Sequence, residues 1–485
     1  MRKSPSSWFN PTVTSWANYG ARDLHLDLRA VRPGSRGVRD QLIGALRDAV
    51  RSGRLAAGTM LPPSRTLAGD LGLARNTVAE AYAELTAEGW LASRQGAGTW
   101  VVTTNARRLP TRPRGTPGVP RHNLLPGSPD VAQFPRSAWL ASARRALTAA
   151  PNEALRMGDA RGRPELREAL ADYLARVRGV RASAETIVIT AGARHGVELL
   201  TRVFSRASPG RPIAVEAYGL FIFRDAIEAL GVPTVPIGLD ADGARVGELD
   251  GVDTPAVLLT PAHHNPHGMS LHPARRTAVV DWAQRTGGYL IEDDYDGEFR
   301  YDRQPVGAVH SLGPDRVVYV GSASKSLSPA LRLGWMALPD DLVEPVLDAA
   351  GGEQFYVDAI AQLTMADFIT SGQYDRHIRR MRLRYRHRRD ALVERLAPFD
   401  VGVRGMSAGI NLLLTLPDGT EHEVLRRAGE AGVGVSGLTR MRHPLAGPDV
   451  PEPDGVIVGF GTPADHAFPA AVDALCGVLT ETLRR

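Results

Sequence analysis

Cysteine is nearly absent from this chain of 485 residues, which has only Cys476. One cysteine excludes a disulfide framework and any zinc or iron–sulfur site built from several thiolates, so we expect a reducing, cytoplasmic environment. The sequence shows neither a signal peptide nor an apolar run near the roughly 18 residues that a membrane span needs. With 43% hydrophobic and 23% charged residues, it has the composition of a globular protein of two or three domains.

Lysine is the second scarcity. The 58 basic residues comprise 56 arginines and two lysines, Lys3 and Lys325. Arginine replaces lysine at most solvated sites, but its pKa stays above about 12, so it cannot act as a neutral amine or form an imine. An interior lysine that persists in such a chain is therefore a candidate for amine chemistry. We interpret Lys3, beside the terminus, as an incidental surface charge.

Basic charge is unevenly distributed. Residues 1–121 contain 18 Lys and Arg against 8 Asp and Glu, a net charge of +10, whereas residues 122–485 contain 40 against 45, a net charge of −5. The cationic first part suggests an anionic polymer as partner, although a solvated basic surface would show the same excess. A separate Arg-rich segment, residues 376–389, is compatible with a second DNA site, but its spacing fits a solvated or dimer-facing helix at least as well.

Residues 103–122 are rich in Pro, Gly and Arg and have no apolar periodicity, which predicts an extended linker. We therefore predict a first domain over residues 20–102 and a second over residues 123–485. Within the second domain we expect a large part at about 160–340 and a small part at about 341–485.

The first domain shows three short helices and a hairpin. Apolar residues recur every four positions in residues 36–53. Two further helices are predicted, one capped by Ser64 and ended by Gly72, the next at about residues 75–88. Residues 90–102 form two strand-like runs around a glycine-rich tip, which predicts a hairpin. This order of elements predicts a winged helix-turn-helix.

In such a fold, the third helix begins in the major groove, and cations of the wing and of the second helix add contacts. The corresponding residues are Arg65, Arg75, Asn76, Thr77, Arg94 and Gly96. We expect them to contact DNA. A helical module that binds protein is the alternative, but the charge of +10 and the basic wing favour DNA.

The second domain alternates short apolar runs with helical segments. The runs are apolar throughout and lie at residues 187–190, 213–215, 256–260, 289–291, 317–320 and 335–338. Strands of this kind are buried on both faces, so they predict an α/β domain with a mostly parallel sheet and helices on both sides. Ligands of such sheets bind at the carboxyl ends of the strands.

Polar side chains gather at four of these strand ends. After the run 317–320, Lys325 has Ser322 three residues before it and Arg332 seven after it. An amine that can form an imine thus lies between two groups that can hold a phosphate. Free backbone N–H groups at the helix start around residues 191–193 offer a further phosphate contact.

Carboxylates and a phenol follow the run 289–291, where a buried Asp can keep a pyridine nitrogen protonated and Tyr295 can hydrogen-bond a phenolic oxygen. A fourth strand-end loop adds Asn265 as a hydrogen-bonding group. The histidines of that loop lack a metal-binding spacing, so we predict no metal site. Each of these four strand-end motifs is weak evidence alone. Together they predict pyridoxal 5′-phosphate (PLP) bound to Lys325.

The first domain closely resembles the GntR-type winged-helix DNA-binding domain over the stretch LPPSRTLAGDLGLARNTVAEAYAELTAEGWLASRQGAGTWVV. The likeness runs from the Leu-Pro-Ser-Arg type opening to the Gly-x-Gly-Thr wing. Ala74 departs from the pattern, because the family usually has a capping Ser there. Its absence would weaken the helix start by about 1 kcal/mol.

The second domain resembles the fold-type-I aminotransferases in the segments MGDARGRPELREAL, TAGARHGVELL, AHHNPHG, EDDYDGEFR and SASKSLSPALRLGW. The resemblance implies that Lys325 binds PLP and that Asp293, or its neighbour Asp294, pairs with the pyridine nitrogen. It places Tyr295 and Asn265 near the cofactor's O3′. The phosphate contacts that it implies are Ser322, Ser324, Arg332 and the backbone of Gly192 and Ala193.

A GntR-type head joined by a linker to such a body is the architecture of the MocR/GabR subfamily of transcriptional regulators, which are head-to-tail homodimers. This resemblance implies a regulator that binds promoter DNA and senses PLP or an amine or amino acid that reacts with PLP, in vitamin B6 synthesis or amine metabolism. A working aminotransferase with an accessory DNA-binding head is one alternative. A DNA-binding scaffold that has lost the cofactor is the other.

Two departures from the family pattern bear on the ligand. Ile457 stands where aminotransferases and amino-acid-sensing members usually have an arginine that binds a carboxylate, and an aliphatic side chain cannot make that pair. Leu220 stands where an aromatic ring usually stacks on the pyridine, with Tyr218 or Phe221 as candidate replacements. The first departure favours PLP itself as effector over an amino acid.

Overall fold

The computed structural model describes residues 37–94, 97–102, 119–156, 158–301, 306–351 and 357–483. It divides into two compact units, residues 1–117 and 118–485, which we call the head and the body. The division falls within the predicted linker. Most of that linker, and residues 20–36 of the predicted first domain, lie outside the described residues. In the described part of the chain, no helix is both long and apolar enough to cross a membrane.

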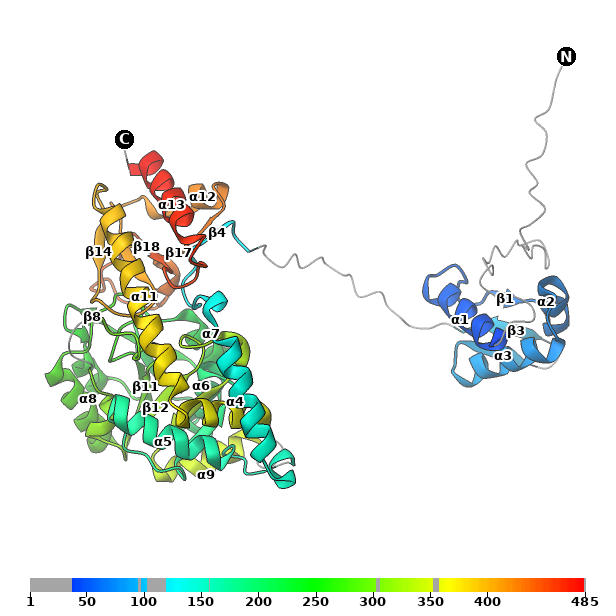
Figure 1. Ribbon diagram of the computed structural model, residues 1–485, viewed down its shortest axis with the longest axis horizontal. Coiled ribbons are helices and arrows are strands. Elements are labelled where there is room, and N and C mark those ends of the chain that lie inside the picture. The colour runs from blue at the N-terminus through cyan, green and yellow to red at the C-terminus, as the bar shows by residue number, and fades with distance from the viewer. Residues whose placement is uncertain are drawn as a thin grey trace, which may run out of the picture. The chain divides into compact units, whose positions relative to one another are not determined.

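The head combines three helices with a small sheet (Figure 1). Its elements are α1 (Val38–Arg51), β1 (Met60–Leu61), α2 (Ser64–Leu71), α3 (Arg75–Ala87), β2 (Leu91–Arg94) and β3 (Gly98–Val101). The strands are antiparallel in the order β1-β3-β2. Each helix contributes fully buried apolar residues, such as Leu42, Leu67 and Val78, to one core. The predicted winged helix-turn-helix is confirmed.

One helix end in the head differs from the prediction. Ser64 is the first residue of α2 and not its cap, so the predicted Ser64 cap is wrong. Pro63, with a ψ of 143°, takes the N-cap position, and its carbonyl accepts the first helical hydrogen bond, from the N–H of Leu67 at 3.0 Å. Gly72 ends α2 as predicted, with a left-handed φ of 65°. Ala74 precedes α3 and makes no side-chain cap bond.

The body is built on a seven-stranded sheet in the order β5-β13-β12-β11-β10-β6-β7. Its strands are β5 (Ile187–Thr190), β6 (Ile213–Glu216), β7 (Thr234–Ile237), β10 (Ala256–Leu259), β11 (Tyr289–Asp293), β12 (Val317–Ser322) and β13 (Gly334–Ala337). Only β13 runs against its neighbours, β12 and β5, so the predicted mostly parallel α/β sheet is confirmed. Because β13 is reversed, its first residues lie at the edge where the parallel strands end.

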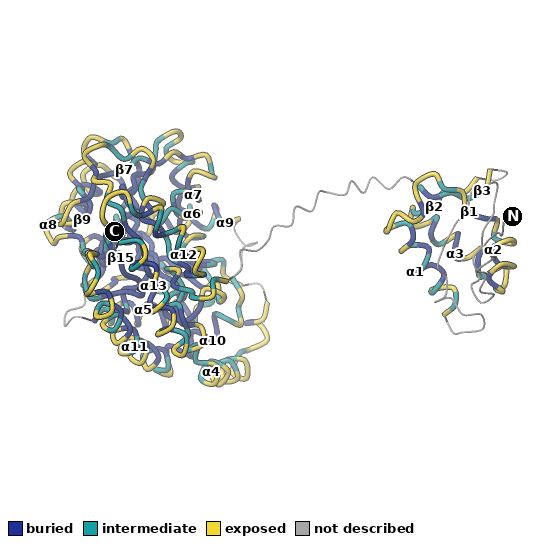
Figure 2. Tube along the Cα trace, turned by 90° about the horizontal axis from the view of Figure 1, so that it is seen from above, coloured by how far each residue is buried: buried dark blue, intermediate teal, exposed yellow. Residues whose placement is uncertain are grey.

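Helices cover both faces of this sheet, which explains why its strands are apolar throughout. They are α4 (Arg136–Ala149), α5 (Pro164–Arg178), α6 (Ala193–Ala207), α7 (Phe221–Ala229), α8 (Pro273–Thr286), α9 (Asp340–Ala350), α10 (Ala359–Thr370) and α11 (Gln373–Leu396). In β5, Val188 packs in one core cluster with α6, α7 and α9, whereas Ile187 and Ile189 pack in another with α5, α10 and α11. Figure 2 shows this interior as buried beneath exposed peripheral segments.

The chain beyond α11 forms a second, antiparallel sheet in the order β14-β15-β18-β17. Its strands are β14 (Gly402–Arg404), β15 (Leu412–Thr415), β17 (Ser436–Gly437) and β18 (Gly455–Val458), with helices α12 (Glu421–Glu430) and α13 (Phe468–Leu483). Two short pairs complete the body: β16 (Val433–Gly434) with β4 (His122–Asn123), and β8 (Leu239–Asp240) with β9 (Gly243–Ala244). The first pair brings the start of the body to this C-terminal part.

Candidate functional site

Lys325 follows the end of β12 in the loop that leads to β13. Its Nζ donates a hydrogen bond to the backbone carbonyl of Gly127, 2.5 Å away. Burial lowers the pKa of this amine, while the charges of Asp293 and Asp296 raise it. The lysine that the sequence singles out therefore lies at the carboxyl edge of the sheet, close to two carboxylates.

Asp293 is the last residue of β11 and pairs in register with Val320 of the neighbouring β12. Its side chain is buried, and its Oδ1 accepts no hydrogen bond from any described residue. Burial raises its pKa to about 8, and the nearby Lys325 acts in the opposite direction. A buried oxygen without a donor is costly, so this carboxyl is suited to a ligand that brings a proton to it.

The neighbouring Asp294 is already paired. Its Oδ2 accepts hydrogen bonds from the guanidinium of Arg178 at 2.6 Å and from the hydroxyl of Tyr319 at 2.7 Å. All three side chains are buried, so the pair is shielded from water. Of the two aspartates that the sequence leaves open, Asp293 is the one with a buried oxygen that accepts no hydrogen bond from the described residues.

Tyr295 belongs to a buried polar group that the sequence does not predict. Its hydroxyl lies 3.0 Å from Nδ1 of His263, and the same nitrogen lies 2.9 Å from Oδ2 of Asp296. The two rings are nearly parallel. Asp296 and His263 thus hold the phenol in place near Lys325, whose pKa responds to Asp296.

Asn265 lies in the loop after β10, and its peptide bond to Pro266 is cis. Its backbone N–H donates to the hydroxyl of Thr260 over 3.4 Å, which ties the loop to the strand end. No hydrogen bond joins its side chain to another described residue. The structure therefore places Asn265 at the predicted edge, without a hydrogen bond to Tyr295 or Lys325.

The predicted phosphate-binding residues come together across three strands. Ser322 of β12 is in register with Gly334 of β13, which is in register with Thr190 of β5. Gly334 lies so close to Gly192 that a Cβ on Gly334 would be 2.7 Å from the Cα of Gly192. The turn before α6 is therefore pressed against the start of β13.

Gly192 caps α6 with a φ of 98°, a conformation that favours glycine, and Ala193 is the first helical residue. A Cβ on Gly192 would lie 3.8 Å from Nη1 of Arg332, so the guanidinium stands over the helix start. The N–H of Ser324 donates to Oγ of Ser322 over 3.4 Å. The start of α6, the guanidinium of Arg332 and the Ser322 hydroxyl thus lie at the same edge of the sheet, where an anion can be bound.

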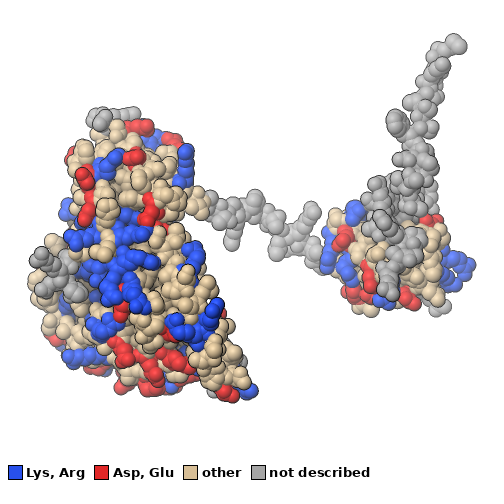
Figure 3. Space-filling view, in the orientation of Figure 1, with Lys and Arg blue, Asp and Glu red and all other residues tan. Residues whose placement is uncertain are grey.

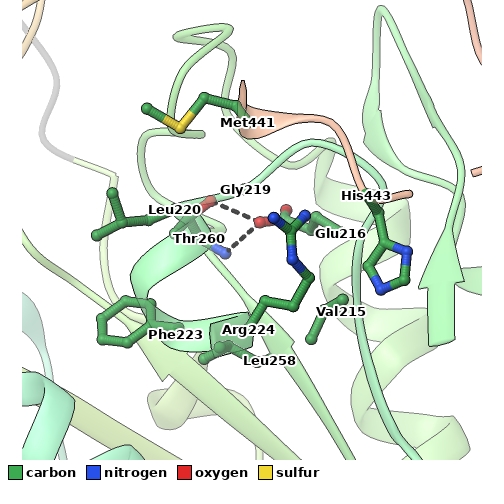
Figure 4. A pocket seen from close by; sticks show the side chains of 10 residues that line it. All are labelled: Val215, Glu216, Gly219, Leu220, Phe223, Arg224, Leu258, Thr260, Met441 and His443. Atoms are coloured by element: carbon green, nitrogen blue, oxygen red, sulfur yellow. Dashed lines mark hydrogen bonds between the residues drawn. The ribbon is translucent and has the colours of Figure 1, made fainter. Parts of the chain in front are cut away.

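A pocket lies beside this site, at the carboxyl ends of β6 and β10 (Figure 4). It is lined by Val215, Glu216, Gly219, Leu220, Phe223, Arg224, Leu258, Thr260, Met441 and His443. Glu216 accepts hydrogen bonds from the N–H and hydroxyl of Thr260, at 3.1 and 2.7 Å, and burial raises its pKa to about 8. None of the predicted cofactor residues lines the pocket, but Leu220, at the aromatic position of the family pattern, does.

Ile457 and the two candidate replacements for the stacking aromatic ring, Tyr218 and Phe221, are each held by contacts within the body. Ile457 is fully buried in β18, in register with Leu413 of β15. The hydroxyl of Tyr218 donates to the carbonyl of Pro451 at 2.9 Å. The ring of Phe221 lies under the guanidinium of Arg440, 3.8 Å from its centre. Both candidate replacements for the stacking aromatic already have other contacts.

The predicted DNA-binding residues of the head lie at its surface. Arg65, Arg75, Asn76 and Arg94 are exposed and Thr77 is half-buried, whereas Gly96 lies outside the described residues. None of the three arginines has a carboxylate partner in the described part of the chain. By contrast, Arg47 of α1 pairs with Glu88 at 2.7 Å. The charges on α2, α3 and the wing are therefore free to meet phosphates.

Two family models match the chain. The model for bacterial regulatory proteins of the gntR family matches residues 38–101, and that for aminotransferase class I and II matches residues 125–442. The chain belongs to the MocR-type regulators, in which a GntR head is joined to an aminotransferase-like body. The predicted fold class and family are thereby confirmed, and this MocR-type protein is a DNA-binding transcriptional regulator whose body has the fold of PLP-binding enzymes.

Curated relatives share this architecture over most of their length. The chain is 33% identical over 447 residues to the pyridoxine biosynthesis transcriptional regulator PdxR of Corynebacterium glutamicum, covering 91% of this chain and 95% of that protein. It is 30% identical over 446 residues to the probable rhizopine catabolism regulatory protein MocR of Rhizobium meliloti, covering 87% and 89%.

Solved aminotransferase structures share the fold of the body. An archaeal alanine:glyoxylate aminotransferase superposes with a TM-score of 0.67 at 25% identity, covering 74% of this chain and 90% of that one. The aspartate aminotransferase of Thermus thermophilus with maleate gives a TM-score of 0.64 at 22% identity, covering 75% and 92%. The fold is thus shared by enzymes and by this regulator.

Proposed function

We propose that this MocR-type regulator binds PLP at Lys325 and that PLP binding changes its affinity for promoter DNA. The observation that carries the proposal is the unpaired Oδ1 of the buried Asp293, close enough to Lys325 for the two charges to interact. A protonated ring nitrogen would give this oxygen the donor that it lacks, and would recover the free energy of an unsatisfied buried acceptor. The residues present thus fit PLP.

Each predicted cofactor residue has a distinct role in this proposal. Lys325 would bind the aldehyde carbon, and Asp293 the pyridine nitrogen. The N–H groups of Gly192 and Ala193 would bind the phosphate with Arg332, assisted by the hydroxyls of Ser322 and Ser324. Tyr295 and Asn265 would lie near O3′. When bound, PLP supplies an aldehyde that reacts with primary amines.

The surroundings of Lys325 prepare its amine for this role. Only the neutral amine is a nucleophile, and burial lowers the pKa of Lys325 towards that form. The carbonyl of Gly127 accepts its hydrogen bond and so fixes the direction of Nζ. Asp293 and Asp296 limit the shift, because each stabilises the ammonium form.

We propose PLP itself, more than an amino acid, as the effector, with vitamin B6 synthesis as the regulated process. Ile457 is buried in β18, where it offers a carboxylate no partner. The name of the C. glutamicum relative, a pyridoxine biosynthesis regulator, points to the same process. An amine that reacts with bound PLP is the second candidate, and sustained turnover of amino acids is not expected.

We also propose a head-to-tail homodimer. Exposed apolar side chains on α4 and α10, helices that pack together, include Leu140, Leu147 and Ile360, which are 67%, 42% and 46% exposed. Exposed apolar side chains on packed helices favour association of subunits. The head-to-tail arrangement is the one that the family resemblance implies. Leu140→Glu should shift the protein towards monomer in sedimentation, while Leu445→Glu, at a residue 71% exposed in the C-terminal part, should not. An unchanged sedimentation coefficient in both variants would place the interface elsewhere.

The scarcity of lysine makes the test of the PLP site sharp. Lys325→Ala should abolish the visible absorption band of protein incubated with PLP, whereas Lys3→Ala, the matched control at the only other lysine, should keep it. Borohydride reduction followed by peptide mass spectrometry should label Lys325. A band that persists in Lys325→Ala would refute the assignment, and sustained transamination of an amino acid with a keto acid would favour the enzyme.

A further inference from the structure

Helix α11 has a buried face and a strongly basic exposed face. Residues 373–396 contain nine arginines and three acidic residues. Tyr374, Ile378, Met381, Tyr385 and Leu392 are buried at spacings of three, four and seven, which turns the remaining positions outward. The exposed arginines are Arg376, Arg379, Arg380, Arg382 and Arg386, with Arg395 near the end of the helix. In Figure 3 basic side chains gather over the face of the body along which α11 runs in Figure 1.

Acidic partners neutralise only part of this arginine set. Arg388, which is buried, pairs with Asp130 at 2.8 Å and with Asp465, and Arg384 also pairs with Asp465. The arginines near the start of α11 have no such partner. Among the described residues, no carboxylate lies within ion-pair distance of the four arginines at 376, 379, 380 and 382. Uncompensated charge is thus concentrated in the first half of α11.

Two of these arginines line a cleft of about 400 Å³ between α11, the end of α5 and the loop after β11. Arg382 donates to the backbone carbonyl of Glu298 at 2.8 and 3.0 Å, which holds its guanidinium at the cleft without neutralising it. Two other arginines of the lining are paired, Arg176 with Asp375 at 2.8 Å and Arg178 with Asp294. The remaining positive charge of the lining comes from Arg379 and Arg382 of α11 and from Arg300, which donates to the carbonyl of Ala262 and the hydroxyl of Ser270.

We propose that the exposed face of α11 from Arg376 to Arg386 is a second DNA-binding surface, which holds the phosphate backbone of duplex DNA flanking the site bound by the head. This inference rests on the proposed binding of promoter DNA by the head. At 1.5 Å per residue, the exposed face from Arg376 to Arg386 is about 15 Å long. A single phosphate group cannot span this length, so the face suits a polymer with phosphates at regular intervals. B-DNA carries a charge about every 1.7 Å of axis, and guanidinium groups match phosphates in geometry.

The role of this surface would be to add affinity without sequence preference. The exposed side chains of α11 from Arg376 to Arg386 are mainly arginines, and arginine contacts to phosphates carry no sequence information. Because head and body are one chain, DNA held by the head stays at high effective concentration for the body. We therefore expect the surface to matter on long duplexes more than on short ones.

The test compares two charge-matched double variants of the full chain. Arg379→Gln with Arg382→Gln removes two unpaired arginines of the surface. Arg285→Gln with Arg395→Gln removes the same charge from exposed arginines that are paired with Asp250 and Asp473, each at 2.5 Å. The probe is a duplex selected from a random pool by the wild-type chain, used as a fragment of about 20 base pairs and extended to about 60.

On the longer duplex, the surface variant should lose about 0.9 units of the slope of log K against log salt for each lost contact, and roughly tenfold in affinity at low salt. The control variant should keep the wild-type slope, and circular dichroism should show that both variants are folded. Equal slopes in the two variants would overturn the inference.

Three other outcomes also bear on whether this face of α11 binds DNA. A variant that loses binding of inorganic pyrophosphate but keeps wild-type affinity for both duplexes would assign the cleft to a small phosphate ester and overturn the DNA proposal. A change of oligomeric state with unchanged DNA binding would assign the face to subunit contact and overturn it as well. If the wild-type chain selects no duplex at all, the proposed function of the head fails, which is distinct from a failure of the surface.

Discussion

The head and the body place their functional charges in opposite surroundings. In the head, Arg65 and Arg75 are exposed and have no carboxylate partner in the described part of the chain. In the body, burial shifts the pKa values of Asp293 upwards and Lys325 downwards. Exposed charges respond mainly to salt, whereas buried charges respond to proton concentration and to pairing. We therefore expect DNA binding to be set by ionic strength and ligand binding by pH.

The largest effect should come from the buried ion pair of the body. Asp294→Asn leaves Arg178 charged and without its partner in the interior, which should lower the free energy of unfolding by about 3–5 kcal/mol. Urea unfolding measures this. Arg176→Gln, on the same helix, breaks the partly exposed pair with Asp375 and should cost at most about 1 kcal/mol. Similar losses in both variants would show that burial does not distinguish the pairs.

The next effect concerns ligand affinity and not stability. Asp293→Asn removes the negative charge that would hold the ring nitrogen, and it should weaken PLP binding by about 2 kcal/mol, or roughly thirtyfold. Absorption titration with PLP gives the Kd. The free energy of unfolding without PLP should not fall, because Asp293 has an unsatisfied oxygen in the fold. An unchanged Kd would mean that another group pairs with the ring.

The pH dependence of stability tests the same carboxyl without a ligand. The pKa of Asp293 is raised to about 8 in the fold. Between its ordinary value, about 4, and 8 the folded protein keeps a proton that the unfolded chain has lost, so the folded state loses stability as pH rises. Glu216, with a pKa of about 8, acts in the same direction. Neutral histidines such as His267, with a pKa of about 4, oppose this below about 6.5, and Lys325 opposes it above its own lowered pKa.

Urea unfolding of the PLP-free protein should therefore show stability falling between pH 6.5 and 8, by up to about 1.4 kcal/mol per pH unit for each such group. Asp293→Asn should flatten this dependence. A wild-type protein whose stability rises through this interval would contradict the raised pKa values.

The smallest effect in free energy belongs to the head. Arg75→Ala should weaken DNA binding by a few fold and reduce the salt slope by about 0.9, because one phosphate contact is lost. Arg65→Ala should act alike. Arg47→Ala is the matched control, since Arg47 is paired with Glu88 on the head's own surface. If Arg75→Ala and Arg47→Ala gave equal slopes of log K against log salt, pairing with a carboxylate would not distinguish the arginines that contact DNA from those that do not.

Local patterns in the sequence predict most of the fold. Continuous apolar runs mark six strands of the large sheet, because both faces of the sheet are covered by helices. They miss β7, whose run Thr234–Ile237 is interrupted by Pro236, a residue that suits an edge strand. They also miss β1, with only two residues, and all four strands of the antiparallel sheet β14-β15-β18-β17. The Ser64 cap is wrong because Pro63 occupies the N-cap position, one residue earlier.

The candidate site is only partly predictable for a physical reason. The residues that follow strand ends, such as Lys325 and Asp293, can be found because topology alone brings strand ends to one edge. The residues that hydrogen-bond to these side chains and their neighbours cannot be found in this way. Arg178 reaches Asp294 from 116 residues away, and His263 reaches Asp296 from 33 away, so no periodicity in the chain signals these contacts.

The reversal of β13 has a consequence for how the ligand site opens. Because β12 and β13 are antiparallel neighbours, Lys325 and Arg332 lie on a single connection between them, while Gly192 and Asp293 are held by a helix start and a central strand. Release of one short segment would free the amine and the guanidinium together. Amide hydrogen exchange in residues 323–333 should therefore slow on PLP binding more than exchange at the end of β11, since local openings control it.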